Sequence, residues 1–170
     1  ASLYQQVSAE KYALEYQAYN LAQMALKNDL ADESISQKRA VILDIDETVL
    51  DNSPYESMLV LQDTTYPYKW AEWLNKADAR LLAGVKDFLQ YSVTNNVEIF
   101  YLTNRKEKFR NVTLANLQKH QIPQAENEHL IMRTKASSKE KRRNKIKEDF
   151  HISLLIGDNL NDFSKIFEEK

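Results

Sequence analysis

Four short apolar runs stand out along the chain, and polar residues border each of them. They cover positions 40–44, 97–102, 129–132 and 152–156, and the first run closes on an acid. Runs of this length and content are typical of strands that are covered on both faces. We therefore predict four buried strands at these positions.

Apolar residues between the runs recur at three- and four-residue steps, which is the spacing of one helix face. This spacing predicts helices near 85–93 and 109–117, and we expect a third helix over 138–148. Strands that alternate with helices favour a parallel sheet. We expect an α/β fold with a central parallel sheet flanked by helices, and a length of 170 residues fits one domain.

The first thirty residues contain no glycine and no proline, and we predict one long helix over 1–30. Its apolar positions form a stripe at helical spacing. The stripe consists of Leu3, Val7, Leu14, Ala18, Leu21 and Ala25. Two interpretations are open: the stripe packs on the body of the protein, or it forms the contact of a homodimer.

The stretch 51–80 breaks the alternation of strands and helices. It holds Pro54 and Pro67 and is rich in aromatic residues. The aromatic residues are Tyr55, Tyr66, Tyr68, Trp70 and Trp73. We expect an insertion between the first strand and its crossover helix, folded as a small cap.

Composition excludes several classes of site. Without cysteine, the chain has no thiol nucleophile, disulfide or cysteine zinc site. With only two glycines, Gly84 and Gly157, it has no glycine-rich phosphate loop or dinucleotide motif. The formal net charge of −2 gives no overall signal for nucleic acid, and no apolar run is long enough to span a membrane.

The candidate chemistry lies at the predicted strand ends, where parallel sheets bind their ligands. Asp44 and Asp46 follow the first run, and alternate residues of an extended chain point to the same side. The second run is followed by Thr103, Asn104 and Arg105, and the fourth by Asp158 and Asp162. One such acid alone is more typical of a helix cap or a turn. Polar motifs after three separate runs favour a shared site instead.

A cluster of acids at one point needs a positive charge. Two carboxylates a few ångströms apart repel, and the pKa of one rises unless a cation lies between them. Oxygen ligands without histidine or cysteine favour a hard cation, Mg²⁺ ahead of Ca²⁺. Because Mg²⁺ keeps several waters and commonly recruits a phosphate oxygen, the pattern points to phosphoryl chemistry.

The residues that carry these motifs resemble the haloacid dehalogenase (HAD) superfamily of phosphohydrolases. Within it, the stretch 40–55 closely resembles the bacterial class C nonspecific acid phosphatases. The stretches 101–105 and 157–163 match the same family, and the resemblance covers roughly 1–165 in order and spacing. It implies the Rossmann-like core of that superfamily with a small cap.

The resemblance also implies roles for single residues. Asp44 would be the nucleophile that forms an aspartyl-phosphate, and Asp46 would protonate the leaving oxygen and then activate water. Asp158 would bind Mg²⁺ together with the Asp44 carboxylate and the main-chain carbonyl of Asp46. Thr103 would hold a phosphate oxygen, and Asp162 would support a lysine or a metal-bound water.

A lysine at the phosphate is implied as well, and the segment 135–145 offers several. The family spacing to the last motif favours Lys139, with Lys135 as the second choice. The other basic residues of this segment alternate with acids, which is typical of a solvated helix face. We therefore expect no nucleic-acid binding.

The activity implied by the resemblance is that of a Mg²⁺-dependent acid phosphatase for small phosphomonoesters, with 5′-nucleotides as the expected substrates. We expect Asn104 and Arg105 to take part in substrate binding and Trp70 to stack on a nucleoside base. The other interpretation of Trp70 is that it packs the cap onto the body. Two alternatives use the same fold: a non-catalytic storage or binding protein, and a phosphotransferase in which an acceptor hydroxyl replaces water.

The family implies an extracytoplasmic protein of the bacterial periplasm, bound to the outer membrane or secreted. The chain begins at Ala1, so we expect a processed chain whose export signal, and any membrane anchor, has been removed. Chains of the family continue well past the last motif, whereas here only 163–170 follow Asp162. We expect either a short variant or a removed tail that would help to enclose the substrate.

Overall fold

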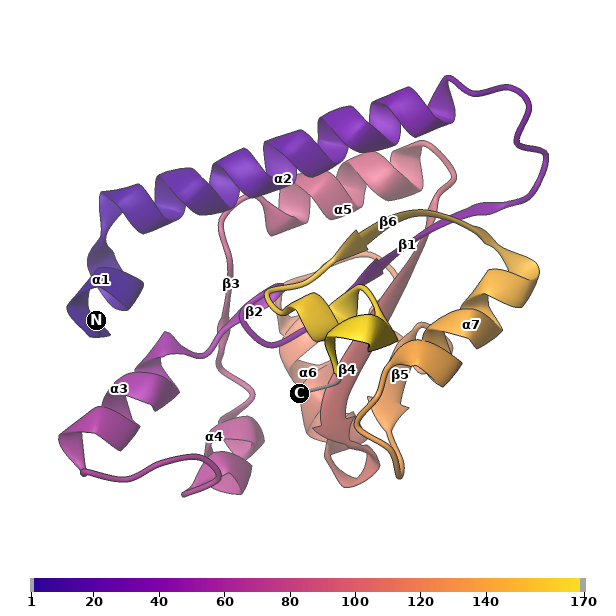
Figure 1. Ribbon diagram of the computed structural model, residues 1–170. Helices are drawn as coiled ribbons and strands as arrows, with labels where there is room; N and C mark the ends of the chain where they lie inside the picture. Colours follow the sequence, from indigo (N-terminus) through magenta and orange to yellow (C-terminus); the bar gives the residue numbers. More distant parts are fainter. Residues whose placement is uncertain (1, 169–170) are drawn as a thin grey trace.

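The computed structural model describes residues 2–168 of the chain (Figure 1). The strands are β1 (Arg39–Leu43), β2 (Leu50–Asp51), β3 (Arg80–Leu81), β4 (Glu98–Lys106), β5 (Leu130–Arg133) and β6 (His151–Ile156). The α-helices are α1 (Ser2–Val7), α2 (Ala9–Leu30), α3 (Ser53–Leu61), α4 (Trp70–Lys76), α5 (Val85–Thr94), α6 (Arg110–Lys119) and α7 (Glu140–Asp149). Short 3₁₀ helices are η1 (Glu107–Phe109), η2 (Leu160–Asp162) and η3 (Lys165–Phe167). Within 2–168, no helix has the length and apolar content needed to cross a membrane.

Four strands form one sheet that is parallel throughout, in the order β5-β4-β1-β6. At its centre, Ile42 lies opposite Phe100 on one side and Leu155 on the other. The predicted fold class is thus confirmed. Because all four strands run in one direction, their carboxyl ends lie at one edge of the sheet, and the three polar motifs follow there.

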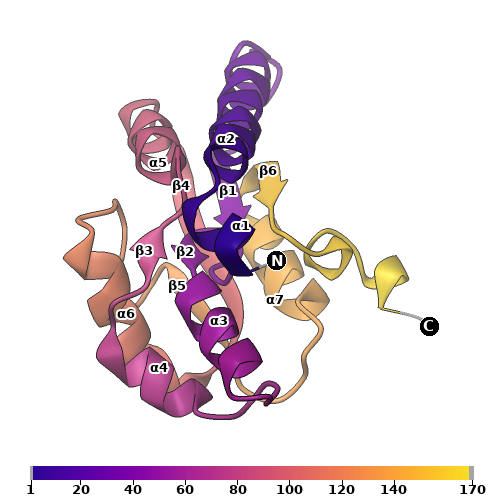
Figure 2. The same ribbon diagram turned by 90° about the vertical axis from the view of Figure 1, so that its left-hand side faces the viewer.

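Each face of the sheet has its own apolar core. On one face, α2, α5 and α6 pack around Val41 and Ile99. On the other face, α7 packs through Ile146 against Ile42. Figures 1 and 2 show α2 and α5 side by side over the first face, with α7 on the opposite side of the sheet.

The predicted burial of the four strands is only partly correct. β1 and the first part of β4 are buried on both faces, as expected. In β5 only every second residue, Leu130 and Met132, is buried. β6 lies at the edge of the sheet, and all of its residues are half-buried. Because β6 pairs with β1 on one side only, its apolar residues are not fully buried.

The predicted helix over 1–30 is wrong in one respect, since it is interrupted at Ser8; residue 1 lies outside the described residues. Ser8 has an extended backbone, with φ of −72° and ψ of 124°, and its Oγ accepts a hydrogen bond from the Lys11 amide at 3.4 Å. A serine in this position satisfies a free N–H of the first turn and begins a new helix. Apolar spacing alone gives no sign of such a break.

The predicted apolar stripe does not pack on the body, because all six of its residues are exposed. The packed face of α2 holds Tyr19 and Leu26, both buried, together with polar residues. Among these, Glu15 Oε2 accepts a hydrogen bond from the Ala83 amide at 2.8 Å. A face that mixes apolar and hydrogen-bonding residues is not found by apolar spacing. A homodimer contact through the exposed stripe stays a prediction.

The segment expected to form a cap leaves the body through an antiparallel pair of short strands, β2 and β3, in which Leu50 lies opposite Leu81. Between these strands the chain forms α3 and α4. Figure 2 shows the two helices together, on the side of the molecule away from α2 and α5. The N-terminal helix α1 packs against α3, and Gln6 Nε2 donates to Ser57 Oγ at 2.6 Å.

Candidate active site

The first motif lies in a tight turn at the end of β1. The amide of Asp44 donates to the carbonyl of Ile156 at 2.9 Å, which extends the pairing of β1 and β6 up to the acid. Beyond it, the amide of Leu50 folds back onto the carbonyl of Ile45 at 2.8 Å. Glu47 adopts a left-handed conformation with φ of 55° inside this turn. The turn holds Asp44 at the carboxyl edge of the sheet.

Helix α2 helps to fix the turn from behind. The hydroxyl of the buried Tyr19 donates to the carbonyl of Thr48 at 2.6 Å. Gly84, at the start of α5, allows α2 and α5 to approach each other. It has φ of 84°, and a Cβ there would lie 2.9 Å from the Cβ of Tyr19 on α2. Gly84 therefore serves both the left-handed turn and the close packing of the two helices.

Lys139 is the lysine that reaches the acids. It lies directly before α7 and is buried, and its Nζ pairs with Asp44 Oδ1 and, at 2.6 Å, with Asp162 Oδ1. Lys135, the second choice from the sequence, is exposed. The geometry therefore brings Lys139, Asp44 and Asp162 together.

Three acids form a cluster here, and two of them, Asp44 and Asp162, pair with this lysine. One carboxylate oxygen from each of Asp44, Asp158 and Asp162 lies within 4.8 Å of the other two. Burial raises the pKa of Asp44 to about 7, although Lys139 acts in the other direction. Asp158 is exposed, yet partial desolvation of its carboxyl and the neighbouring Asp162 also raise its pKa. One lysine does not balance these carboxylates, and the all-oxygen set fits a hard divalent cation such as Mg²⁺.

The loop after β6 fixes Asp162 by its own hydrogen bonds. Asp162 Oδ2 accepts from the Asn159 amide at 3.2 Å, and the Asn159 side chain accepts from the Asn161 amide at 3.0 Å, which together cap η2. The Asp162 side chain packs directly on Gly157, where an added Cβ would lie 2.6 Å from the Cβ of Asp162. This close approach explains the glycine before Asp158.

The second motif lies inside β4, which runs on to Lys106, four residues beyond the predicted strand. Thr103 is fully buried, and its Oγ1 accepts from the Arg105 amide at 3.0 Å, which leaves the hydroxyl proton to donate. Asn104 is exposed, and its Oδ1 accepts from Arg142 at 2.7 Å. The alternation of the strand therefore directs Thr103 and Arg105 inward and Asn104 outward.

Two arginines of α7 hold the second and fourth motifs, so the predicted solvated face for the basic residues of 135–145 is wrong for this pair, and Arg143 is buried. Arg142 NH1 donates to the carbonyl of Thr103 at 2.7 Å, and Arg143 NH1 donates to the carbonyl of Asp162 at 2.7 Å. Both follow Lys139 within one helical turn, so α7 fixes the second and fourth motifs on either side of the lysine. The Arg-Arg pair can be seen in the sequence. Its main-chain carbonyl partners cannot be predicted from spacing, because they lie 39 and 19 positions away.

Asp46 has a separate set of partners. Arg105 donates to its carboxylate from Nε at 3.1 Å and from NH2 at 2.7 Å, and Asn52 Nδ2 donates to Oδ1 at 2.8 Å. The side chain of Asp46 is 30% exposed, against 9% for Asp44. Arg105, predicted to bind substrate, is buried with its guanidinium on Asp46. Its role toward a substrate stays a prediction.

A cavity of about 260 Å³ opens beside Asp46. Its lining residues are Asp46, Glu47, Asn52, Glu56, Tyr66, Trp70, Asn104, Arg105 and Arg133. The ring of Trp70 packs edge-on against Tyr55 and Tyr66, with centroids 4.9 and 5.7 Å away. Trp70 therefore packs among the aromatic residues of the α3–α4 segment and also borders the cavity, so the sequence-based alternatives for it do not exclude each other.

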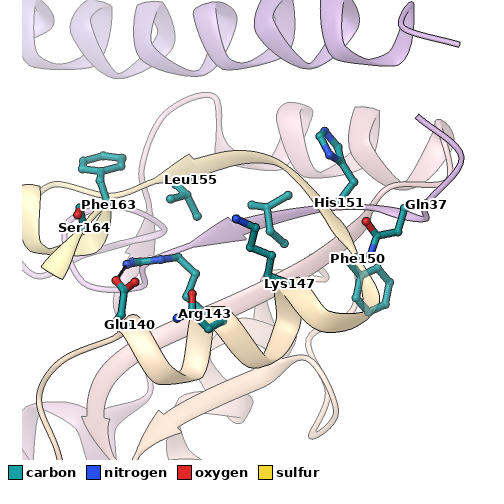
Figure 3. A pocket seen from close by; sticks show the side chains of 11 residues that line it. Gln37, Glu140, Arg143, Lys147, Phe150, His151, Leu155, Phe163 and Ser164 are labelled. Carbon is teal, nitrogen blue, oxygen red and sulfur yellow. Dashed lines mark hydrogen bonds and ion pairs between the residues drawn. The ribbon is translucent and has the colours of Figure 1, made fainter. Parts of the chain in front are cut away.

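A larger cavity, of about 550 Å³, lies between α7 and β6. Figure 3 shows Leu155 and Lys147 along it, Phe163 near one end and His151 near the other. None of the three clustered aspartates lines this hollow. The chemistry of the acids, rather than the volume of a cavity, identifies the candidate active site.

Comparison with known proteins gives the family of the chain. A family model described as HAD superfamily, subfamily IIIB (Acid phosphatase), matches residues 1–170. The class C acid phosphatase from Bacillus anthracis is 42% identical with a TM-score of 0.95, over 99% of this chain and 71% of that chain. A crystal structure of the class C acid phosphatase from Bacillus anthracis with tungstate bound is 44% identical with a TM-score of 0.92, over 96% and 69%. The chain thus belongs to the acid phosphatase family of HAD subfamily IIIB.

Proposed function

We propose that this protein is a Mg²⁺-dependent acid phosphatase that hydrolyses small phosphomonoesters, in particular 5′-nucleotides, through an aspartyl-phosphate on Asp44. The observation that carries this function is the cluster of Asp44, Asp158 and Asp162, in which one lysine pairs with two of the three acids. Such an excess of carboxylates calls for a divalent cation, and a divalent cation beside a carboxylate nucleophile suits phosphoryl transfer.

The proposed reaction has two steps. A carboxylate oxygen of Asp44 attacks phosphorus while the bond from phosphorus to the leaving oxygen breaks, and Asp46 gives its proton to that oxygen. Water then attacks the aspartyl-phosphate, Asp46 takes a proton from this water, and inorganic phosphate leaves. Both carboxyl groups end in the state in which they began.

Other residues would stabilise the phosphate. Lys139 Nζ and the hydroxyl proton of Thr103 would be donors for its oxygens. Arg142 supports Thr103 through its carbonyl, and Arg143 supports Asp162, the partner of Lys139, in the same way. The Asp44 and Asp158 carboxylates and the main-chain carbonyl of Asp46 would hold Mg²⁺, which when bound offsets the charge of the carboxylates and the phosphate. Tungstate, bound in the related class C structure, is a tetrahedral oxyanion like phosphate, which supports a phosphate site in this protein.

The cavity beside Asp46 is the proposed place of the leaving group. Trp70 and Tyr66 offer aromatic faces to a nucleoside base, and Asn104, Arg105 and Arg133 offer polar groups. Family membership further supports an extracytoplasmic protein of the bacterial periplasm or outside the cell.

The first experiment measures hydrolysis of 4-nitrophenyl phosphate at acidic pH. EDTA should abolish turnover and Mg²⁺ should restore it. With a ³²P-labelled monoester and an acid quench, Asp46→Asn should accumulate label on the protein, because hydrolysis of the aspartyl-phosphate needs its base, whereas Asp44→Asn should carry none. Turnover that is insensitive to EDTA, or label on Asp44→Asn, would contradict the mechanism.

A substrate panel then tests the substrate class. 5′-Nucleotides should be hydrolysed with a higher kcat/KM than 3′-nucleotides and sugar phosphates. Transfer of phosphate to an added nucleoside, in place of release, would identify a phosphotransferase. Phosphomonoester binding without turnover would identify a binding protein.

A further inference from the structure

Asn52 connects the candidate acid–base residue to the α3–α4 segment. Its Nδ2 donates to Asp46 Oδ1 at 2.8 Å, while its Oδ1 accepts from Trp73 Nε1 on α4, also at 2.8 Å. Asn52 is buried, and its amide N–H donates to Glu47 Oε1 at 2.8 Å. A continuous chain of hydrogen bonds therefore leads from Trp73 through Asn52 to Asp46.

The chemistry of the indole fixes which groups donate and which accept in this series of hydrogen bonds. A tryptophan Nε1 can only donate a hydrogen bond, whereas an asparagine amide can present either its oxygen or its nitrogen. The donation from Trp73 therefore requires Oδ1 on its side of the Asn52 amide. This orientation leaves Nδ2 facing Asp46, so Trp73 makes Asn52 a donor to the carboxyl.

The second support of Asp46 comes from the body of the protein. Arg105 reaches Asp46 from β4 and is itself bonded to Thr113 of α6 at 3.3 Å. Asp46 thus lies between one donor held by the body and one donor held by α4. Trp73 does not border the cavity beside Asp46, and instead lines a separate hollow with residues such as Pro54 and Met58.

We propose that Trp73 is a positioning residue for Asp46, acting through the orientation of the Asn52 amide. This inference rests on the proposed function, in which Asp46 transfers the proton. Its consequence concerns leaving groups. An alkyl phosphate needs a proton on its leaving oxygen, whereas a nitrophenolate leaves without one, so an error in the position of Asp46 should affect the first more than the second.

The test compares kcat/KM for glycerol phosphate and for 4-nitrophenyl phosphate in Trp73→Phe. Phenylalanine keeps an aromatic ring but cannot donate to Asn52. We expect about a 10- to 100-fold loss on glycerol phosphate and a loss of about threefold or less on 4-nitrophenyl phosphate. In an Asn52→Ala background, Trp73→Phe should cause little further change in the ratio of the two kcat/KM values, because both substitutions interrupt the same series of hydrogen bonds.

Tyr55→Phe is the matched control. It removes the hydrogen bond from the Tyr55 hydroxyl to the Tyr68 carbonyl, 2.9 Å long, in the same aromatic cluster but outside the chain to Asp46. Its ratio of the two substrates should equal that of the unmodified protein, with thermal melting used to check the fold of every variant.

The outcomes separate this inference from the function on which it rests. If Asp46→Asn selectively loses activity on glycerol phosphate but Trp73→Phe lowers both substrates equally, Trp73 has only a packing role and the inference is overturned. If Asp46→Asn itself shows no dependence on the leaving group, the acid role of Asp46 in the proposed function fails instead.

Discussion

Two clusters of charge lie at opposite ends of β1, and they differ in the balance between donors and carboxylates. At the amino end, one carboxylate, Asp29, is surrounded by donors: Arg39 Nε lies at 2.9 Å and Ser153 Oγ at 2.6 Å. His151 Nε2 pairs with the same carboxylate at 2.7 Å. At the carboxyl end the ratio is reversed, since three aspartates cluster and Lys139 pairs with two of them.

The pKa shifts follow this balance. Burial works against the charge of Asp29, but its three donors outweigh burial and hold the pKa below its usual range. For Asp44, burial prevails over the single lysine, and the pKa rises to about 7. The excess of donors around Asp29 connects α2 to the sheet through hydrogen bonds. The excess of carboxylates around Asp44 suits a bound cation. The ratio of donors to carboxylates, more than the number of acids, separates the structural cluster from the candidate active site.

The largest expected effect comes from Asp44→Asn, which removes one of the excess carboxylates. Turnover with Mg²⁺ should fall about 10⁴-fold or more, because the proposed nucleophile is lost. The melting temperature of the EDTA-treated variant should equal or exceed that of the unmodified protein, because a buried charge without full compensation costs free energy. Steady-state kinetics and thermal melting measure the two quantities.

A marked drop in the melting temperature of EDTA-treated Asp44→Asn would contradict the proposed difference between the two clusters. It would mean that the carboxylate is already balanced by Lys139 in the metal-free fold, as Asp29 is balanced by its donors. Turnover within tenfold of the unmodified protein would remove Asp44 from the nucleophile's role.

The two glycines give a smaller effect that distinguishes the loop after β6 from the α2–α5 contact. Gly157→Ala should push Asp162 away from Lys139, and we expect kcat to fall about 10- to 100-fold, because a shift of an ångström in a catalytic group has an effect of that size. Gly84→Ala places a Cβ against Tyr19 at a left-handed φ, and should lower the free energy of unfolding by about 1–3 kcal/mol with kcat within about threefold. Denaturation and kinetics on both variants provide the measurement. The reverse pattern would show that the α2–α5 contact, rather than the loop after β6, controls catalysis.

The sequence predicted the strands and the motifs at their ends because these depend on local patterns. An apolar run marks a strand, and the parallel geometry then brings Asp44, Thr103 and Asp158 to one edge without further information. The family resemblance supplied the choice of Lys139, since several lysines lie near the expected position. The structure brings this lysine to Asp44 and Asp162.

The parts that could not be predicted depend on pairs of residues far apart in the chain. Asn52 and Trp73 are 21 positions apart, and the Arg142 side chain meets a main-chain carbonyl 39 positions away. The packed face of α2 was missed for a related reason, since Glu15 and Asp29 are polar and act through hydrogen bonds to the body. Apolar periodicity detects burial of side chains but not hydrogen bonds of this kind.

The smallest effect concerns the donor-rich cluster and is seen in stability alone. Asp29→Asn should lower the free energy of unfolding at pH 7 by about 1–3 kcal/mol and leave kcat of the folded protein unchanged. Because the folded pKa of Asp29 is lowered, its contribution is complete above the unfolded value near ~4 and is lost as the pH falls through the folded value. Urea denaturation at several pH values should therefore show the two proteins converging in acid, while Asp149→Asn, the same change at an exposed carboxyl, gives no such gap. A gap that persists at low pH, or a loss of kcat, would place Asp29 with the acids at the other end of β1.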